Sequence, residues 1–195
     1  MTTAAQSAKP RTHPALDWWK SVCDPESGDH GARAKLRRCR STADVISIPA
    51  GVRLPQMLGA LPRRGTDLDA GFARGLDLAR VLAHVTGNSG AHPMRDVGWP
   101  VFPGSRREGE VEKRPIMSEA RFRRLLQSEP GEDLVAQFTR LVALLGGETD
   151  IAALADGFRY WDDEDGRTKQ RWSIEYFNAG SAMRSGTTTS EDASV

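Results

Sequence analysis

The segment Gly31–Ser41 gathers positive charge in a chain whose formal net charge is only +1. It contains no acidic residue, and its basic residues are Arg33, Lys35, Arg37, Arg38 and Arg40. Most of them are arginines, whose planar guanidinium binds phosphate oxygens through two parallel hydrogen bonds. This chemistry indicates attraction to a polyanion such as a nucleic-acid backbone. The alternative interpretation is a solvated basic face that binds nothing.

Further basic residues lie on or beside helices that we predict in the second half of the chain. They are Arg121, Arg124, Arg140, Arg167, Lys169 and Arg171. Acidic residues collect in predicted turns, so a net charge near zero does not exclude a basic face. The sequence lacks an RNP motif, a KH loop and zinc-finger spacing, which favours contacts to the backbone over reading of base edges.

Catalytic and metal-binding patterns are missing from the sequence. The histidines show no zinc-binding spacing, and His84, near the end of a long predicted helix, is interpreted as a packing or surface residue. The acidic stretch Asp162–Gly166 fails the EF-hand template, because Trp161 and Trp172 would fall at ligand positions. A metal-dependent nuclease that uses Asp150, Asp156 or the Asp162–Asp165 cluster is kept as a hypothesis with little support in the sequence. We therefore predict a protein that is not an enzyme and needs no cofactor and no metal.

The spacing of apolar residues predicts an all-α fold. Helices are expected over Ala15–Val22, about 32–43, about 53–61, Asp67–Thr86, a segment capped by Ser118, Glu132–Leu145, a segment starting at Thr149 or Asp150, and about 165–178. In the second of these, Arg33, Arg37 and Arg40 would form one basic stripe. No segment shows the alternating pattern of a strand.

The punctuation of the chain predicts two packed helical halves. The expected boundaries are a disordered arm at 1–13, an N-terminal half at 14–87, a long Gly/Pro/Arg-rich loop at 88–117, a C-terminal half at 118–178 and a disordered tail at 179–195. No apolar run is long enough to span a membrane, and the N-terminus lacks a secretory signal, so we predict a cytoplasmic protein with no membrane contact.

Three stretches resemble a known family when they are taken together. They are GARAKLRRCRSTADVISIPA (Gly31–Ala50), SEARFRRLLQSEPGEDLVAQFTRLVALL (Ser118–Leu145) and WDDEDGRTKQRWSIEYF (Trp161–Phe177). With the WW pair near the start, they resemble the CasB family, the small subunit of the type I-E CRISPR Cascade complex. The segment WPVFPGSRREGEVEKRPIM departs from the family pattern, since its prolines forbid a regular helix.

The resemblance implies a non-catalytic subunit of a crRNA-guided antiviral surveillance complex. Its partners would be other Cascade subunits, a second copy of itself, the crRNA–target DNA hybrid and the displaced strand. It would stabilise the R-loop through backbone contacts, and Arg37, Arg38, Arg121, Arg124, Arg140, Arg167, Lys169 and Arg171 match the family's basic positions. The alternative is a protein-interaction adaptor whose basic faces dock acidic partner surfaces without touching nucleic acid.

Overall fold

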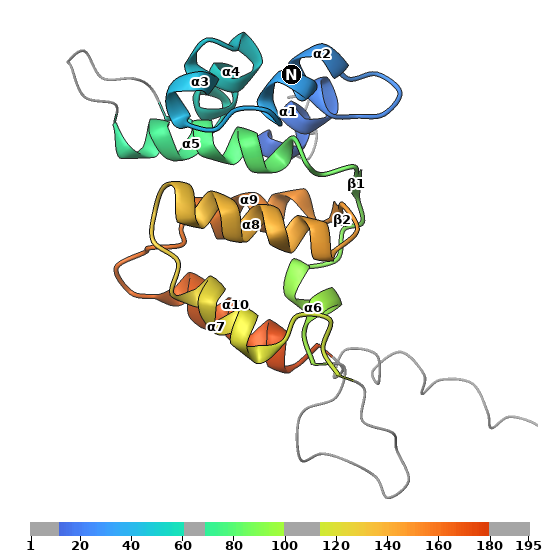
Figure 1. Cartoon of the computed structure of the whole chain (residues 1–195), viewed down its shortest axis with the longest axis vertical. Coiled ribbons are helices and arrows are strands. Elements are labelled where there is room, and N and C mark those ends of the chain that lie inside the picture. The colour runs from blue at the N-terminus through green and yellow to red at the C-terminus, as the bar shows by residue number, and fades with distance from the viewer. Residues whose placement is uncertain (1–11, 61–68, 100–113, 180–195) are drawn as a thin grey trace, which may run out of the picture.

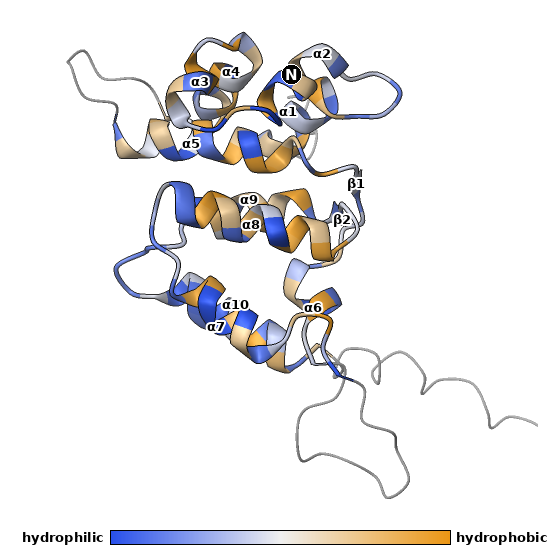
Figure 2. Cartoon of the chain, in the orientation of Figure 1, coloured by the Kyte–Doolittle hydropathy of each residue, from blue (hydrophilic) through white to orange (hydrophobic). Residues whose placement is uncertain are grey.

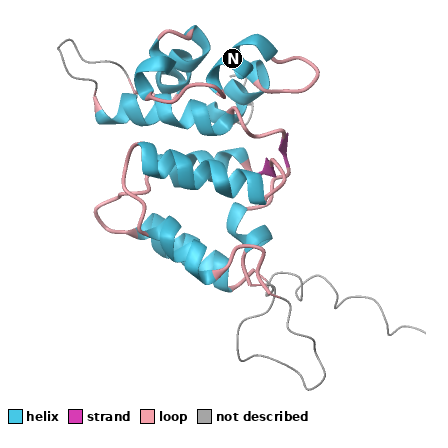
Figure 3. Cartoon of the chain, viewed as in Figure 1, coloured by secondary structure: helices cyan, strands magenta, loops and turns pink. Residues whose placement is uncertain are grey.

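The computed structural model describes residues 12–60, 69–99 and 114–179, and this part of the chain is mostly helical (Figure 3). The helices are α1 (Pro14–Val22), α2 (His30–Leu36), α3 (Thr42–Ile46), α4 (Pro49–Met57), α5 (Ala70–Leu82), α6 (Pro93–Val97), α7 (Glu119–Leu126), α8 (Glu132–Leu144), α9 (Ile151–Arg159) and α10 (Arg167–Phe177). The predicted all-α fold is confirmed. None of the described helices is long and apolar enough to cross a membrane.

The helices stack in three tiers (Figure 1). Helices α1 to α5 form the first tier, α8 and α9 form the second, and α7 and α10 form the third with α6 at their side. Helix α5 packs against both helices of the second tier. A two-residue parallel pairing of β1 (Gly87–Asn88) with β2 (Glu148–Thr149) joins the chain leaving the first tier to the chain leaving α8.

Aromatic side chains fill the space between the second and third tiers. The ring of Phe138 on α8 meets Phe158 and Trp161 edge-on, at centroid distances of 5.1 Å and 5.2 Å. Trp172 of α10 closes the cluster and lies against Gly157, where an added Cβ would stand 2.1 Å from the indole. Because Phe138 must face this cluster, the rotation of α8 about its axis is fixed.

Helix α7 is held against α10 by one stacked pair. The ring of Phe122 lies parallel to that of Tyr176, with centroids 4.0 Å apart and an angle of 9°. The Tyr176 hydroxyl donates a hydrogen bond of 2.7 Å to the carbonyl oxygen of Met117, and burial raises the pKa of this phenol to about 12. Hydrophilic residues recur along the α7 and α10 ribbons of the third tier (Figure 2).

Several predicted helix starts are confirmed. Each is set by residues that adjoin the first turn of the helix. The Ser118 hydroxyl accepts a hydrogen bond from the backbone N–H of Arg121 and begins α7. Asp150 accepts from two backbone N–H groups and begins α9, and Pro14 occupies the first turn of α1.

The helix predicted over about 32–43 is wrong. Helix α2 ends at Leu36, and α3 begins only at Thr42. Ser41 and Asp44 form a reciprocal capping box, which starts a new helix at the point where the prediction continued the old one. Arg33, Arg37 and Arg40 therefore do not form one helical stripe.

Three other predictions need correction. The helix predicted over about 53–61 is α4, which starts earlier, at Pro49, because proline fits the first helical turn, and ends at Met57. The segment predicted as an irregular loop contains β1 and α6, and α6 starts where Pro93 follows a capping His92. The long helix of the first half is shorter than expected, because α5 is capped by Asp69 and ends at Leu82. The expectations for 1–11, 180–195, Asp67 and the centre of the loop, 100–113, lie outside the described residues.

Candidate nucleic-acid interface

A polar hollow lies between the first and second tiers, where α2, α5 and α8 meet. We call it the upper hollow, and its volume is about 340 Å³. Its polar lining consists of Arg37, Arg80, His84, Glu132, Thr139 and Arg140. Three guanidinium groups and one carboxylate thus border a single concave surface.

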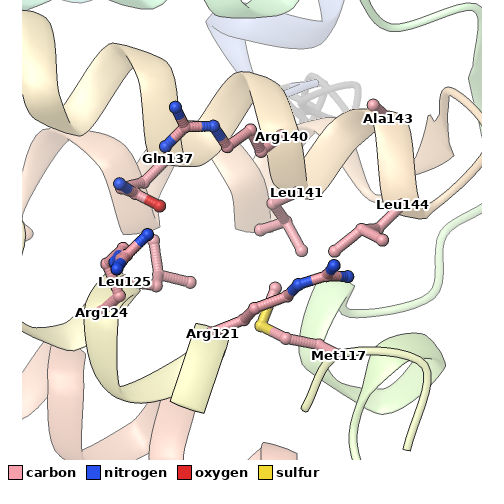
Figure 4. Close-up of a pocket in the computed structure, with 9 residues that line it drawn as sticks. All are labelled: Met117, Arg121, Arg124, Leu125, Gln137, Arg140, Leu141, Ala143 and Leu144. Carbon is pink, nitrogen blue, oxygen red and sulfur yellow. The ribbon is translucent and has the colours of Figure 1, made fainter. Parts of the chain in front are cut away.

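A second hollow, the lower hollow, lies between α8 and α7 and has a volume of about 460 Å³. Figure 4 shows Arg121 and Arg124 reaching up from α7 while Arg140 extends from α8 above them. The remaining lining is mostly apolar and includes Leu125 and Leu141. The cavity therefore combines a basic rim with an apolar floor.

Arg140 lines both hollows, which makes them neighbours along α8. Together, Arg37, Arg121, Arg124 and Arg140 form what we call the α8 basic face. All four are exposed, and in the described ranges none of them pairs with a carboxylate. Guanidinium groups that are gathered without counter-charges favour an anionic partner.

Arg33 is separate from this face, because its donors point into the protein. Its Nε donates to the carbonyl oxygen of Ala83 at 3.0 Å, and its Nη atoms donate to Cys23 at 3.2 Å and Val85 at 3.1 Å. The side chain ties α2 to the end of α5, so its observed contacts are structural. Arg38 is exposed and lines neither hollow, and its Nε donates to the carbonyl of Ala34 at 2.9 Å.

The three basic residues of α10 are not brought to the α8 basic face. Arg167 pairs with Asp165 at 2.7 Å, and the Lys169 ammonium lies 5.6 Å from the centroid of the Trp161 ring. Arg171 lines a third hollow together with Asp156, and this hollow shares no residue with the other two. The structure thus brings together four of the nine predicted residues.

Arg80, which lines the upper hollow, anchors a polar network. It forms two hydrogen bonds with Glu132, of 2.6 Å and 2.8 Å, and one of 3.4 Å with Asp77. Asp77 also accepts a hydrogen bond from the Thr42 hydroxyl, and burial raises the pKa of this carboxyl group. The network links α3, α5 and α8 and so holds the two walls of the hollow together.

Sequence reasoning missed Arg80 and underrated His84 as parts of this surface. The available signal was a polar row on an otherwise apolar helix pattern. Asp77, Arg80 and His84 are spaced by three and four residues, which places them on one side of the predicted helix.

Three of the acidic residues considered for a nuclease are engaged in structural contacts. Asp150 caps α9, Asp156 lies 3.2 Å from the His13 imidazole and Asp162 pairs with Arg74 at 2.9 Å. Within the described residues, no group of three or more His, Cys, Asp or Glu side chains is placed to hold a metal ion.

Comparison with known proteins identifies the family. The family model for CRISPR-associated protein Cse2 matches residues 32–177, which include all the residues of the α8 basic face. No curated protein and no solved structure matches the chain. Cse2 is the CasB family that the sequence motifs resemble. The chain belongs to the Cse2 family, the small structural subunits of the type I-E CRISPR Cascade complex.

Proposed function

We propose that this Cascade small subunit stabilises the R-loop by holding a nucleic-acid backbone along the α8 basic face. The observation that carries the proposal is that Arg140 lines both hollows, so that the α8 basic face extends from Arg37 to Arg121. This face would act in the cytoplasm, within a complex of other Cascade subunits and a second copy of this chain.

The energetics of an R-loop suit such a surface. The guide–target hybrid is about as stable as the DNA duplex that it replaces, so modest protein contacts shift the balance. Each neutralised phosphate adds about 0.7 to 0.9 to the slope of log affinity against log salt. A few unpaired guanidinium groups are therefore enough, and this role needs no catalytic residue. Arg33, Arg38 and the basic residues of α10 form no part of the α8 basic face or of its proposed role.

The test compares two double variants in the assembled complex. Arg121→Ala with Arg124→Ala removes two charges from the lower hollow, whereas Arg53→Ala with Arg123→Ala removes two exposed charges that line neither hollow. We expect the first variant to weaken target binding and to lower the salt slope by about 1.4 to 1.8. Equal affinities and equal slopes in the two double variants would refute the proposal.

The second candidate function is an adaptor that docks an acidic protein surface. The apolar floor of the lower hollow favours it, because Leu125 and Leu141 would suit a protein side chain better than a phosphate. Crosslinking from position 124 in the assembled complex separates the two functions. Links to nucleic acid support the R-loop role, and links to protein alone support the adaptor.

A further inference from the structure

His84 has an unusual position in the upper hollow. Its side chain is half-buried, lines the hollow and makes no hydrogen bond within the described part of the chain. Arg33 binds the carbonyl oxygens of Ala83 and Val85, the residues on either side of His84. These two hydrogen bonds hold the backbone of His84 at the edge of the hollow.

The surroundings of His84 are mainly cationic. Its charged and titratable neighbours are Arg33 from α2, Arg37 and Cys39 from the turn that follows α2, Arg80 from α5, and Glu132 and Arg140 from α8. Glu132 already binds Arg80 through both oxygens, so it offers no carboxylate oxygen free of that pairing. Burial lowers the pKa of His84, and the charges of Arg37 and then Arg33 lower it further. The neutral form of the imidazole is therefore favoured in the free protein.

An anion in the upper hollow would reverse this balance. A phosphate between Arg37 and Arg140 would offset the two charges that have no counter-ion, and it would favour the charged form of the imidazole. The hydroxyl of Thr139 adds a neutral donor on the same surface. A bound phosphate would thus accept a hydrogen bond from His84 and favour protonation of its imidazole.

We propose that the upper hollow binds one phosphate of a nucleic-acid backbone and that His84 becomes a protonated ligand of this phosphate on binding. The proposal rests on the proposed function and adds to it the protonation of His84 on binding. Binding at this site is linked to proton uptake, so affinity rises as pH falls toward the range where imidazole titrates. A rise of one unit in the pKa of His84 on binding corresponds to about a tenfold gain in affinity.

The experiment measures target-DNA affinity of the assembled complex between pH 8 and pH 5.5 at constant ionic strength. The readout is the ratio of the dissociation constant of His84→Gln to that of the wild type at each pH, because titration of other subunits cancels in this ratio. We expect the ratio to be close to one at pH 8 and to rise by up to about tenfold at pH 5.5. His30→Gln, an exposed histidine at the start of α2 that does not line the hollow, serves as the control. Its ratio should stay constant.

A ratio for His84→Gln that is independent of pH would overturn the proposal. His84→Asn replaces it if thermal unfolding shows that the glutamine variant is unstable. The Arg121→Ala with Arg124→Ala variant at pH 8 keeps the outcomes distinct, because it tests the lower hollow without involving His84. If that variant weakens binding while the His84 ratio stays flat, the proton linkage alone fails. If that variant matches its control, the proposed function fails.

The phosphate could belong to target DNA or to the guide RNA. Retention of the subunit in the guide-loaded complex without target, measured at the same two pH values, separates these sources. A pH-dependent defect of His84→Gln only after target is added assigns the phosphate to DNA. The same defect before target is added assigns it to the guide. A defect in neither assay overturns the site.

Discussion

Arg80 and Glu132 join α5 to α8 through two parallel hydrogen bonds, Nη1–Oε1 at 2.6 Å and Nη2–Oε2 at 2.8 Å. The Arg80 side chain is only 8% exposed, whereas that of Glu132 is 58% exposed. The pair therefore connects a guanidinium inside the protein to a carboxylate at its surface. It also crosses from the first tier to the second at the base of the upper hollow.

We expect Glu132→Gln to lower the free energy of unfolding by about 1 to 2 kcal/mol, because it leaves a buried guanidinium short of one charged acceptor. Urea unfolding of the free protein measures the change. Glu129→Gln is the matched control, since Glu129 is also exposed and its side chain has no partner among the described residues. Equal stability of the two variants would show that the pair contributes nothing to the contact between tiers.

Arg33→Lys separates structural from electrostatic roles because it keeps the charge. A lysine ammonium cannot reproduce the guanidinium geometry that serves Cys23, Ala83 and Val85 together. We expect a loss of about 1 to 3 kcal/mol in unfolding free energy. Arg37→Lys, one turn later and exposed, should change stability by less than about 0.5 kcal/mol. A stable Arg33→Lys protein would contradict the structural role.

The Arg95–Glu175 pair predicts a pH-dependent contribution to stability. The hydrogen bond of 2.6 Å from Arg95 lowers the pKa of Glu175 below its ordinary value. A depressed carboxyl pKa stabilises the folded state above the ordinary value, and this contribution disappears as pH falls through the folded-state pKa. Arg95→Gln should therefore reduce stability at pH 7, by less than about 1 kcal/mol because the pair is partly exposed, and have less effect near pH 3.

Thermal unfolding at pH 7, 5 and 3 provides this measurement. Arg53→Gln removes an exposed arginine of α4 that has no carboxylate partner among the described residues, and its offset should not vary in the same way. An Arg95→Gln deficit that stays constant down to pH 3 would exclude Glu175 as its origin.

Helix positions were predictable where the signal is local. Ser118 and Asp150 each cap a helix through neighbouring backbone groups, so the residue type and the apolar period that follows are sufficient. Helix propensity does not predict the break after Leu36, because helix-forming residues continue past it and only the capping box of Ser41 marks the new start. Local signals thus located most helices and misjudged one boundary that matters for the site.

The fate of individual arginines was not predictable, because it depends on partners far away in the sequence. Arg33 and Arg37 look equivalent at a spacing of four residues, yet Arg33 is bound by carbonyl groups 50 and 52 residues later. Arg171 looks as available as Arg140, but the fold places it in a hollow that also contains Asp156. Composition indicates that arginines are numerous, and only tertiary packing selects those that remain free.

The position of Arg140 between two hollows has a consequence for avidity. A strand fixed at one hollow would present its next phosphates to the other at a high effective concentration, so the second contact would cost little additional ordering. Losses from substitutions in the two hollows should then fail to add, and Arg140→Ala should cost more than its single charge suggests. Binding of a flexible polymer in this way depends on the closeness of the two hollows as much as on their charge.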